Sequence, residues 1–185
     1  MKSTNLMTFI KPVVASLAIA LSGTATLGAD TLTNVATPMS PQSSHVVTSH
    51  EFNLPAEKVW DLIAGFNTLP DYHEAVPESR LAKGGVVRYL TISEEAGGGI
   101  VVERLVNFDD EAMTFSYRIT DLIESPLPFK NYQAWVRLQS TGPNSCILRW
   151  QSRFDAIGPK EEAEEIARVI YQGCYDGIER VLGGR

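Results

Sequence analysis

The sequence has few of the residues that metal, nucleotide and nucleic-acid sites require. Its 185 residues include two cysteines and three histidines, and their spacing matches no metal site. The glycines at 97–99 precede neither Lys-Ser/Thr nor a helical pattern, which excludes a phosphate-binding loop, and no nucleophile elbow is present. The formal net charge is −6, and the absence of basic clusters argues against nucleic acid and anionic membrane surfaces as partners. We therefore predict no metal and no cofactor.

The first 29 residues have the composition of an export signal. Lys2 and Lys11 give a positive start, and residues 12–21 form an apolar core of about ten residues, which is too short to span a bilayer. Residues 23–25 and 27–29 are two possible cleavage sites. We predict a cleaved signal peptide at 1–29, a flexible linker at 30–44, and a periplasmic or secreted protein with no integral membrane span in its mature form. An uncleaved membrane anchor is the alternative.

Residues 159–182 predict a long amphipathic helix near the end of the chain. Apolar and small residues recur there with the i, i+3, i+4, i+7 spacing of one helical face. They are Ala163, Ile166, Ala167, Ile170, Gly173, Cys174, Gly177, Ile178 and Val181. A helix of about 24 residues is roughly 36 Å long, so its apolar face must pack against a large surface.

The middle of the chain has the pattern of strands separated by turns. A first strand at 45–52 and two short helical segments at 54–66 and 69–73 precede six strands near 80–83, 86–93, 99–108, 112–120, 131–139 and 146–154. The later strands alternate between one apolar and one polar face. This order predicts an α+β domain over residues 45–185, in which a curved antiparallel sheet of seven strands packs against the C-terminal helix, with two short helices after the first strand.

Several short motifs, in this order along the chain, resemble the START-related superfamily of polyketide cyclase/dehydrase-like proteins. They are LPAEKVW at 54–60, ERL at 103–105, FSYRI at 115–119 and NY at 131–132. The resemblance covers residues 46–182 and implies a helix-grip fold, with an apolar cavity between the sheet and the long helix. It also implies that His73, Glu103 and Tyr132 line this cavity, and that Tyr117 and Ser152 occupy matching positions.

The residues themselves favour an apolar pocket with a few polar groups. Glu103 alternates with Val101 and Leu105 and is expected to face inward, where a carboxylate needs a hydrogen bond, an ion pair or a proton; the opposite strand orientation would leave it exposed. His73 is expected near the mouth, either bonding a ligand or pairing with Glu103, with a solvated surface histidine as the alternative. The loops at 97–99 and 125–128 are expected to flank the entrance.

Gly173 and Gly177 on the predicted helix are expected to leave room for a ligand, since each costs about 0.8–1 kcal/mol relative to alanine in a helix interior. Close contact with a bulky strand residue is the alternative. Cys146 and Cys174 are predicted to be two buried thiols, with a disulfide as the alternative. The full set of predicted ligand-binding residues is His73, Val101, Glu103, Tyr117, Tyr132, Ala134, Trp150, Ser152, Ile170, Gly173 and Gly177.

Three functions are consistent with these observations. The first is an exported binding protein that holds a hydrophobic small molecule or lipid between the sheet and the C-terminal helix. The second is a polyketide cyclase/dehydratase-like enzyme that uses Glu103 and His73 as acid and base without a metal. The third is a periplasmic accessory protein with a filled core and a protein partner. A cavity would distinguish the first two functions from the third.

Overall fold

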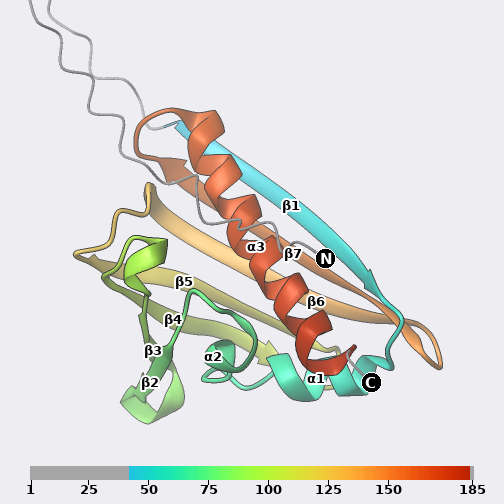
Figure 1. Ribbon diagram of the computed structural model, residues 1–185. Coiled ribbons are helices and arrows are strands. Elements are labelled where there is room, and N and C mark those ends of the chain that lie inside the picture. The colour runs from blue at the N-terminus through green and yellow to red at the C-terminus, as the bar shows by residue number, and fades with distance from the viewer. Residues whose placement is uncertain (1–41, 184–185) are drawn as a thin grey trace, which may run out of the picture. The chain divides into compact units, whose positions relative to one another are not determined.

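A computed structural model describes residues 42–183, in which a seven-stranded antiparallel sheet curves around a long helix (Figure 1). The predicted α+β helix-grip architecture is therefore confirmed. The elements are β1 (Gln42–Phe52), α1 (Ala56–Ile63), α2 (Leu69–Tyr72), β2 (Glu78–Ala82), η1 (Lys83–Gly85), β3 (Val87–Thr91), η2 (Glu94–Ala96), β4 (Ile100–Asp109), β5 (Thr114–Ile123), β6 (Phe129–Gly142), β7 (Ser145–Ala156) and α3 (Lys160–Leu182). The predicted signal peptide at 1–29 and most of the predicted linker lie outside the described residues.

The first strand lies beside the last one, because the strand order is β1-β7-β6-β5-β4-β3-β2 with every neighbouring pair antiparallel. Pairing with β7 begins at Gln42, and Ser44 lies opposite Phe154 and is buried. The prediction that the linker extends to residue 44 is therefore wrong by three residues, since residues 42–44 continue the β1–β7 ladder.

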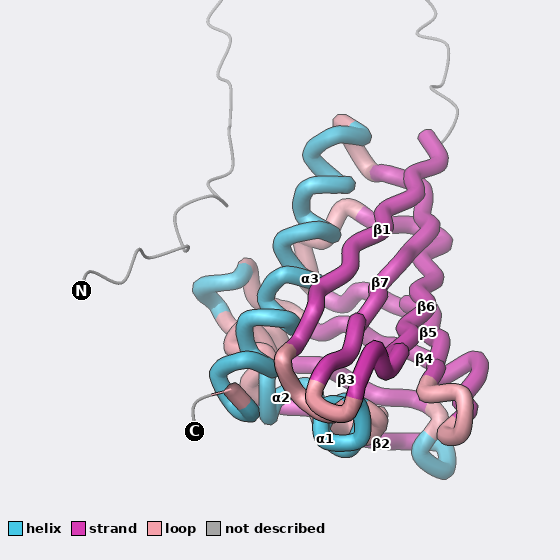
Figure 2. Tube along the Cα trace, turned by 90° about the vertical axis from the view of Figure 1, so that its right-hand side faces the viewer, coloured by secondary structure: helices cyan, strands magenta, loops and turns pink. Residues whose placement is uncertain are grey.

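The apolar core lies between the concave face of the sheet and the helices. Figure 2 shows α3 on one side of the sheet. In β7, Leu148, Trp150 and Phe154 are buried, whereas Arg149 and Arg153 are exposed. This period of two places one side of each strand against the helices and the other side in water.

The buried stripe of α3 differs in part from the predicted one. Tyr171 and Tyr175 are 0% and 1% exposed, while Val181 is 41% exposed. Burial of the two large phenol rings fills the space between the helix and the sheet. No helix within residues 42–183 is long and apolar enough to cross a membrane.

The two short helices close one end of the sheet. α1 buries Ala56, Val59, Trp60 and Ile63, which share one face of the helix. α2 is a single turn with Pro70 near its start, where a missing N–H costs no helical hydrogen bond. It contacts α3 and places Tyr72 in the core.

Candidate functional site

The interior contains two groups of buried polar side chains. The first is an ion pair between Arg88 of β3 and Glu103 of β4. The second, called here the hydroxyl cluster, consists of Tyr117, Tyr132, Trp150, Ser152 and Tyr171, which come from β5, β6, β7 and α3. Both groups lie among apolar residues, where polar contacts are stronger than in water and unpaired polar atoms are costly.

The ion pair arises from the register of two neighbouring strands. Arg88 and Glu103 lie directly opposite each other, and the Nε and Nη2 atoms of Arg88 are each 2.7 Å from Oε2 of Glu103. Arg88 is 3% exposed and Glu103 is 5% exposed. Glu103 therefore faces inward, as its alternation with Val101 indicated. Both nitrogen atoms thus contact the same carboxylate oxygen of Glu103.

Aromatic groups surround the guanidinium of Arg88. Its Nη1 donates to the backbone oxygen of Phe66 at 3.0 Å, and its Cζ lies 4.3 Å from the ring centre of Phe66 and 5.3 Å from that of Tyr117. Burial raises the pKa of Glu103 above its ordinary value, and the charge of Arg88 opposes this rise. Sequence reasoning missed Arg88, although it alternates with Leu90 on one side of its strand.

His73 is held against the backbone of α3. Its Nδ1 accepts from the N–H of Ala75 at 3.3 Å, so the proton is on Nε2, which donates to the oxygen of Ile170 at 3.1 Å. Burial lowers the pKa of His73, which favours this neutral form. The predicted pairing of His73 with Glu103 is not formed, because each side chain has another partner.

Gly173 and Gly177 allow α3 to approach α2 closely. A Cβ at Gly177 would lie 1.4 Å from the backbone oxygen of Tyr72, and a Cβ at Gly173 would lie 2.9 Å from Nε2 of His73. The prediction that these glycines leave room for a ligand is therefore wrong. The atoms nearest to them belong to the α2 segment and not to Trp150 or another strand residue.

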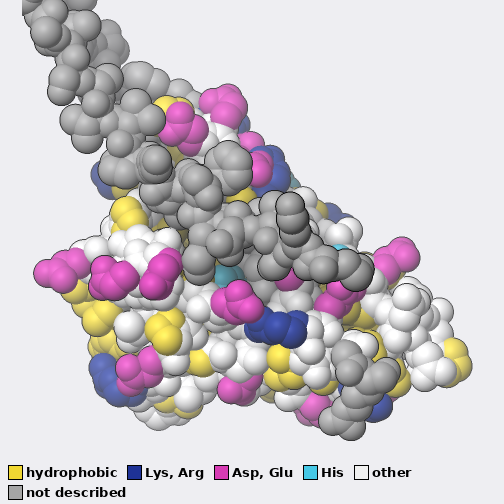
Figure 3. Space-filling model, viewed as in Figure 1, with side chains coloured by type: hydrophobic (Ala, Val, Ile, Leu, Met, Phe, Trp, Pro, Cys, Tyr) yellow, Lys and Arg dark blue, Asp and Glu magenta, His cyan; other side chains and the backbone are white. Residues whose placement is uncertain are grey.

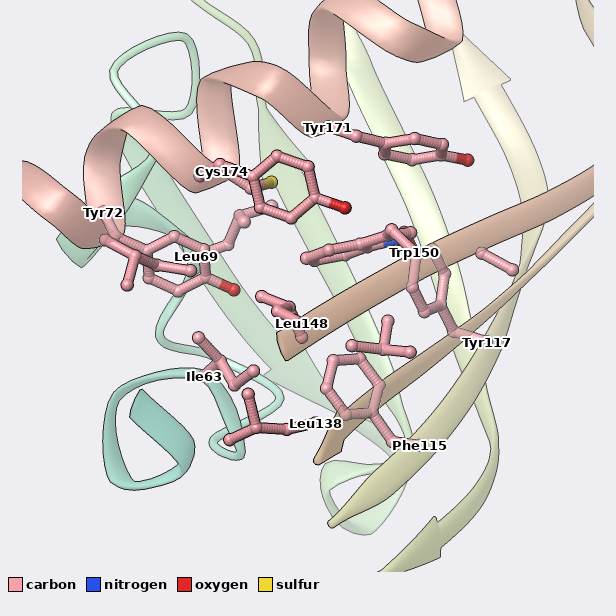
Figure 4. Close-up of a cluster of buried hydrophobic side chains, with 14 of the residues drawn as sticks. Ile63, Leu69, Tyr72, Phe115, Tyr117, Leu138, Leu148, Trp150, Tyr171 and Cys174 are labelled. Carbon is pink, nitrogen blue, oxygen red and sulfur yellow. The ribbon is translucent and has the colours of Figure 1, made fainter. Parts of the chain in front are cut away.

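The hydroxyl cluster connects the sheet to α3. The hydroxyls of Tyr132 and Tyr171 are 2.5 Å apart, and Nε1 of Trp150 donates to the hydroxyl of Tyr117 at 3.1 Å. The rings of Trp150 and Tyr171 are stacked with centroids 5.6 Å apart (Figure 4). Ser152 is fully buried. Within the described part of the chain its Oγ forms no hydrogen bond of ordinary geometry, but it lies near enough to the Tyr171 hydroxyl to oppose the rise in the pKa of Tyr171.

Burial raises the pKa values of Tyr117, Tyr132 and Tyr171 well above the ordinary value for tyrosine. These phenols are therefore neutral and act only as hydrogen-bond donors and acceptors. Tyr171 was missed from sequence, although it lies four residues after Ala167 and thus shares its helical face.

The remaining predicted residues form part of the packed interior. Val101 and Ala134 are 3% and 0% exposed. The loops at 97–99 and 125–128 contact each other, since a Cβ at Gly97 would lie 2.8 Å from Cγ of Pro126. Cys146 and Cys174 are free and buried, which confirms the prediction of two thiols.

Trp150, Tyr171 and Tyr175 are buried beneath α3. Two hollows lie on the surface. One of about 410 Å³ is on the outer face of the sheet, and one of about 690 Å³ lies beside the C-terminal end of α3. None of the eleven predicted ligand-binding residues lines either hollow. Across residues 42–183, no three potential metal-ligating side chains gather at one place.

Comparison with known proteins agrees with this architecture. The family model for polyketide cyclase/dehydrase and lipid transport proteins matches residues 43–183. The chain belongs to this family. The predicted resemblance to the START-related superfamily is thereby confirmed. Among curated proteins, none matches the chain.

Solved structures include relatives of this family member. An uncharacterized protein from Bacillus thuringiensis is 32% identical with a TM-score of 0.68, over 74% of this chain and 97% of that chain. The protein XoxI from Bacillus cereus is 31% identical with a TM-score of 0.70, over 76% and 96% of the two chains. The Zhui aromatase/cyclase from Streptomyces sp. R1128 is 18% identical with a TM-score of 0.59, over 77% and 93%, and so shows the fold alone.

Proposed function

We propose that this family member binds a hydrophobic small molecule or lipid between the sheet and α3. The observation that carries the proposal is the buried hydroxyl of Ser152, which forms no hydrogen bond of ordinary geometry within residues 42–183, although the Tyr171 hydroxyl lies near enough to interact with it. A buried polar group without a hydrogen bond costs about 1–3 kcal/mol, and few such groups occur in native proteins. A ligand with a hydroxyl or carbonyl group would supply the missing partner and offset this cost.

The neighbours of Ser152 suit such a ligand. Ser152 lies opposite Ala134 on β6 and Val46 on β1, which are both apolar and fully buried. The phenols of Tyr132 and Tyr171 offer two further polar contacts. This combination of an apolar wall with a few convergent polar groups is typical of small-molecule sites.

Binding beside Ser152 requires a rearrangement, because Tyr171 stacks on Trp150 and bonds to Tyr132 there. The Tyr132–Tyr171 hydrogen bond is a direct polar link between the sheet and this part of α3. We infer that the ligand displaces the Tyr171 ring from Trp150 and takes over its bond to Tyr132. The family's description as polyketide cyclase/dehydrase and lipid transport proteins supports a hydrophobic ligand of this kind.

Acid–base catalysis by Glu103 and His73 has less support. Both ring nitrogens of His73 bond to backbone groups, and the carboxylate of Glu103 is paired with Arg88. The burial of Trp150, Tyr171 and Tyr175 beneath α3 instead favours the accessory protein with a protein partner as the second candidate. The pattern of residues 1–29 supports export, and we propose that the protein acts in the periplasm or outside the cell.

The test uses residues 30–185, which contain every residue of the buried core. Native mass spectrometry, followed by solvent extraction, detects a co-purified hydrophobic compound. Titration with a fluorescent fatty acid analogue then measures binding. We expect Ser152→Ala to weaken binding about tenfold, as the loss of one buried hydrogen bond does, while the exposed Ser140→Ala leaves it unchanged. Absence of both a bound compound and fatty acid binding would refute the proposal in favour of the accessory function.

A further inference from the structure

The outer face of the sheet carries five exposed arginines on four adjacent strands. This arginine face consists of Arg104 of β4, Arg118 of β5, Arg137 of β6, and Arg149 and Arg153 of β7. These residues are spread over 50 positions of the sequence, so no basic cluster is visible there. Only the register of the strands brings them together in a chain whose net charge is −6.

The register of the strands places two pairs of arginines directly opposite each other. Arg104 is the direct partner of Arg118, and Arg137 is the direct partner of Arg149. Like charges in directly opposed positions destabilise a sheet. Such an arrangement costs stability unless an anion lies over it.

Within residues 42–183, none of the five arginines forms an ion pair, whereas Arg88, Arg168 and Arg180 each bond to a carboxylate. Besides the buried Glu103, these strands carry three carboxylates, and each accepts a hydrogen bond from another group. Asp155 accepts from Asn131, Asp109 from the backbone of Ala112, and Asp121 from the backbone of Leu122. The guanidinium groups at the centre are therefore available to an external anion.

A surface hollow of about 410 Å³ lies on the same face. Its lining includes Arg137, Arg149 and Trp135, together with the polar side chains of Ser116 and Gln151. Trp135 is half-buried and lies opposite both Ser116 and Gln151. An indole is thus placed between guanidinium groups on a surface that no helix covers in Figure 2.

We propose that the arginine face docks the protein on an anionic phospholipid bilayer. Guanidinium groups match phosphate in a bidentate geometry, tryptophan favours the membrane–water interface, and an anionic leaflet attracts basic residues close to its surface. The proposal rests on the proposed function, since a lipid carrier must reach a bilayer to load or release its ligand. It differs from the prediction, drawn from sequence, that anionic membrane surfaces are poor partners, and that prediction had no access to the register of the strands.

The spread of the charges favours a bilayer over a protein partner. The five arginines lie on four strands and surround a hollow that also has polar and apolar lining residues, so they suit a broad anionic surface. The opposite side of the molecule is rich in acidic side chains (Figure 3). The separation of charge orients the protein with its arginine face toward a negative surface.

Sedimentation with lipid vesicles tests the proposal on residues 30–185. One vesicle is phosphatidylcholine alone, and the other contains about one-third phosphatidylglycerol. We expect binding to the anionic vesicle only, and weaker binding in high salt because surface charges are screened. Arg137→Gln with Arg149→Gln should reduce binding about 25-fold, or about fivefold for each arginine removed.

Lys160→Gln with Arg168→Gln is the matched control, because it removes two positive charges from α3, one half-buried and one exposed, and should change binding less than twofold. A second readout is Trp135 fluorescence, which lipids brominated in their acyl chains should quench in wild type but not in Trp135→Phe. Equal binding to neutral vesicles, or wild-type binding by the double arginine variant, would overturn the proposal. So would binding of nucleic acid or polyglutamate in the absence of vesicle binding.

The outcome is distinguishable from that for the proposed function. Ser152→Ala should bind anionic vesicles like the wild type, since Ser152 lies on the other side of β7. If the fluorescent fatty acid analogue binds and vesicles do not, docking is refuted and the interior site remains. If vesicles bind and the fatty acid analogue does not, docking is supported and the interior site is refuted.

Discussion

Replacing Gly177 with alanine tests the close approach of α3 to α2. The added Cβ would lie 1.4 Å from the backbone oxygen of Tyr72 and 2.6 Å from its carbonyl carbon. Ordinary contact begins at 3.4 Å, so the two segments would have to separate by about 2 Å. The obstacle is backbone, which cannot rotate away as a side chain can.

Two opposing effects decide the magnitude. Alanine gains about 1 kcal/mol over glycine in a helix interior, whereas overpacking a core costs about 1–3 kcal/mol and sometimes more. Because the overlap at Gly177 is with a carbonyl group, we expect the upper end of this range and a net loss of about 2 kcal/mol. For a domain of this size, that loss lowers Tm by about 4–8 °C.

Thermal unfolding followed by circular dichroism measures the effect, with Gly173→Ala as the control. A Cβ at Gly173 would meet the ring of His73 at 2.9 Å, and the ring can shift by a few tenths of an ångström. We expect Gly173→Ala to change stability by less than about 1 kcal/mol, since the helix gain offsets the tight contact. If Gly177→Ala is as stable as the wild type or more stable, the close contact does not exist and space beside the helix is open.

Three further predictions concern the buried polar groups. Arg88→Met should destabilise the protein by about 3–5 kcal/mol in urea unfolding, because it leaves the Glu103 carboxylate buried without a partner. Arg88→Met combined with Glu103→Leu should recover most of the loss. An Arg88→Met variant as stable as the wild type would contradict the pairing. Ser152→Ala should leave stability without ligand unchanged or raise it by about 1 kcal/mol, and a clear loss would show that this hydroxyl has a partner. His73 should make the free energy of unfolding depend on pH. Burial lowers its pKa from 6.5 in the folded state, so the unfolded state takes up the proton more readily. The free energy of unfolding should therefore fall as pH decreases below 6.5 towards the lowered folded-state pKa. His73→Gln should remove this pH dependence of the free energy of unfolding. A variant with the same pH dependence as the wild type would refute the role of His73.

The sequence was sufficient for features that depend on local periodicity. The alternation in residues 131–139 and 146–154 predicted β6 and β7, and the spacing of Ala163, Ala167 and Cys174 predicted α3. The inward direction of Glu103 was also predicted, because it follows from the alternation within one strand. These properties need only the geometry of a single element.

Features that depend on two distant elements were not predicted. The partner of Glu103 is Arg88, and the pairing requires the register of β3 against β4. The role of Gly177 requires knowing that the backbone of Tyr72 lies beside it. The arginine face likewise requires the alignment of four strands. A one-residue change in that register would move each side chain to the other face, and the sequence does not state the register.

The position of β1 at the edge of the sheet beside β7 has a consequence for the order of events during synthesis. Thr48 and Trp150, which lie opposite each other, are 102 positions apart. The first strand therefore leaves the ribosome long before its partner exists, and the loop that joins them is slow to close. A nascent chain halted before residue 145 has neither β7 nor α3, so it should remain sensitive to protease until the last hairpin strand is made. Such a delay leaves the polypeptide without its complete sheet during most of its production.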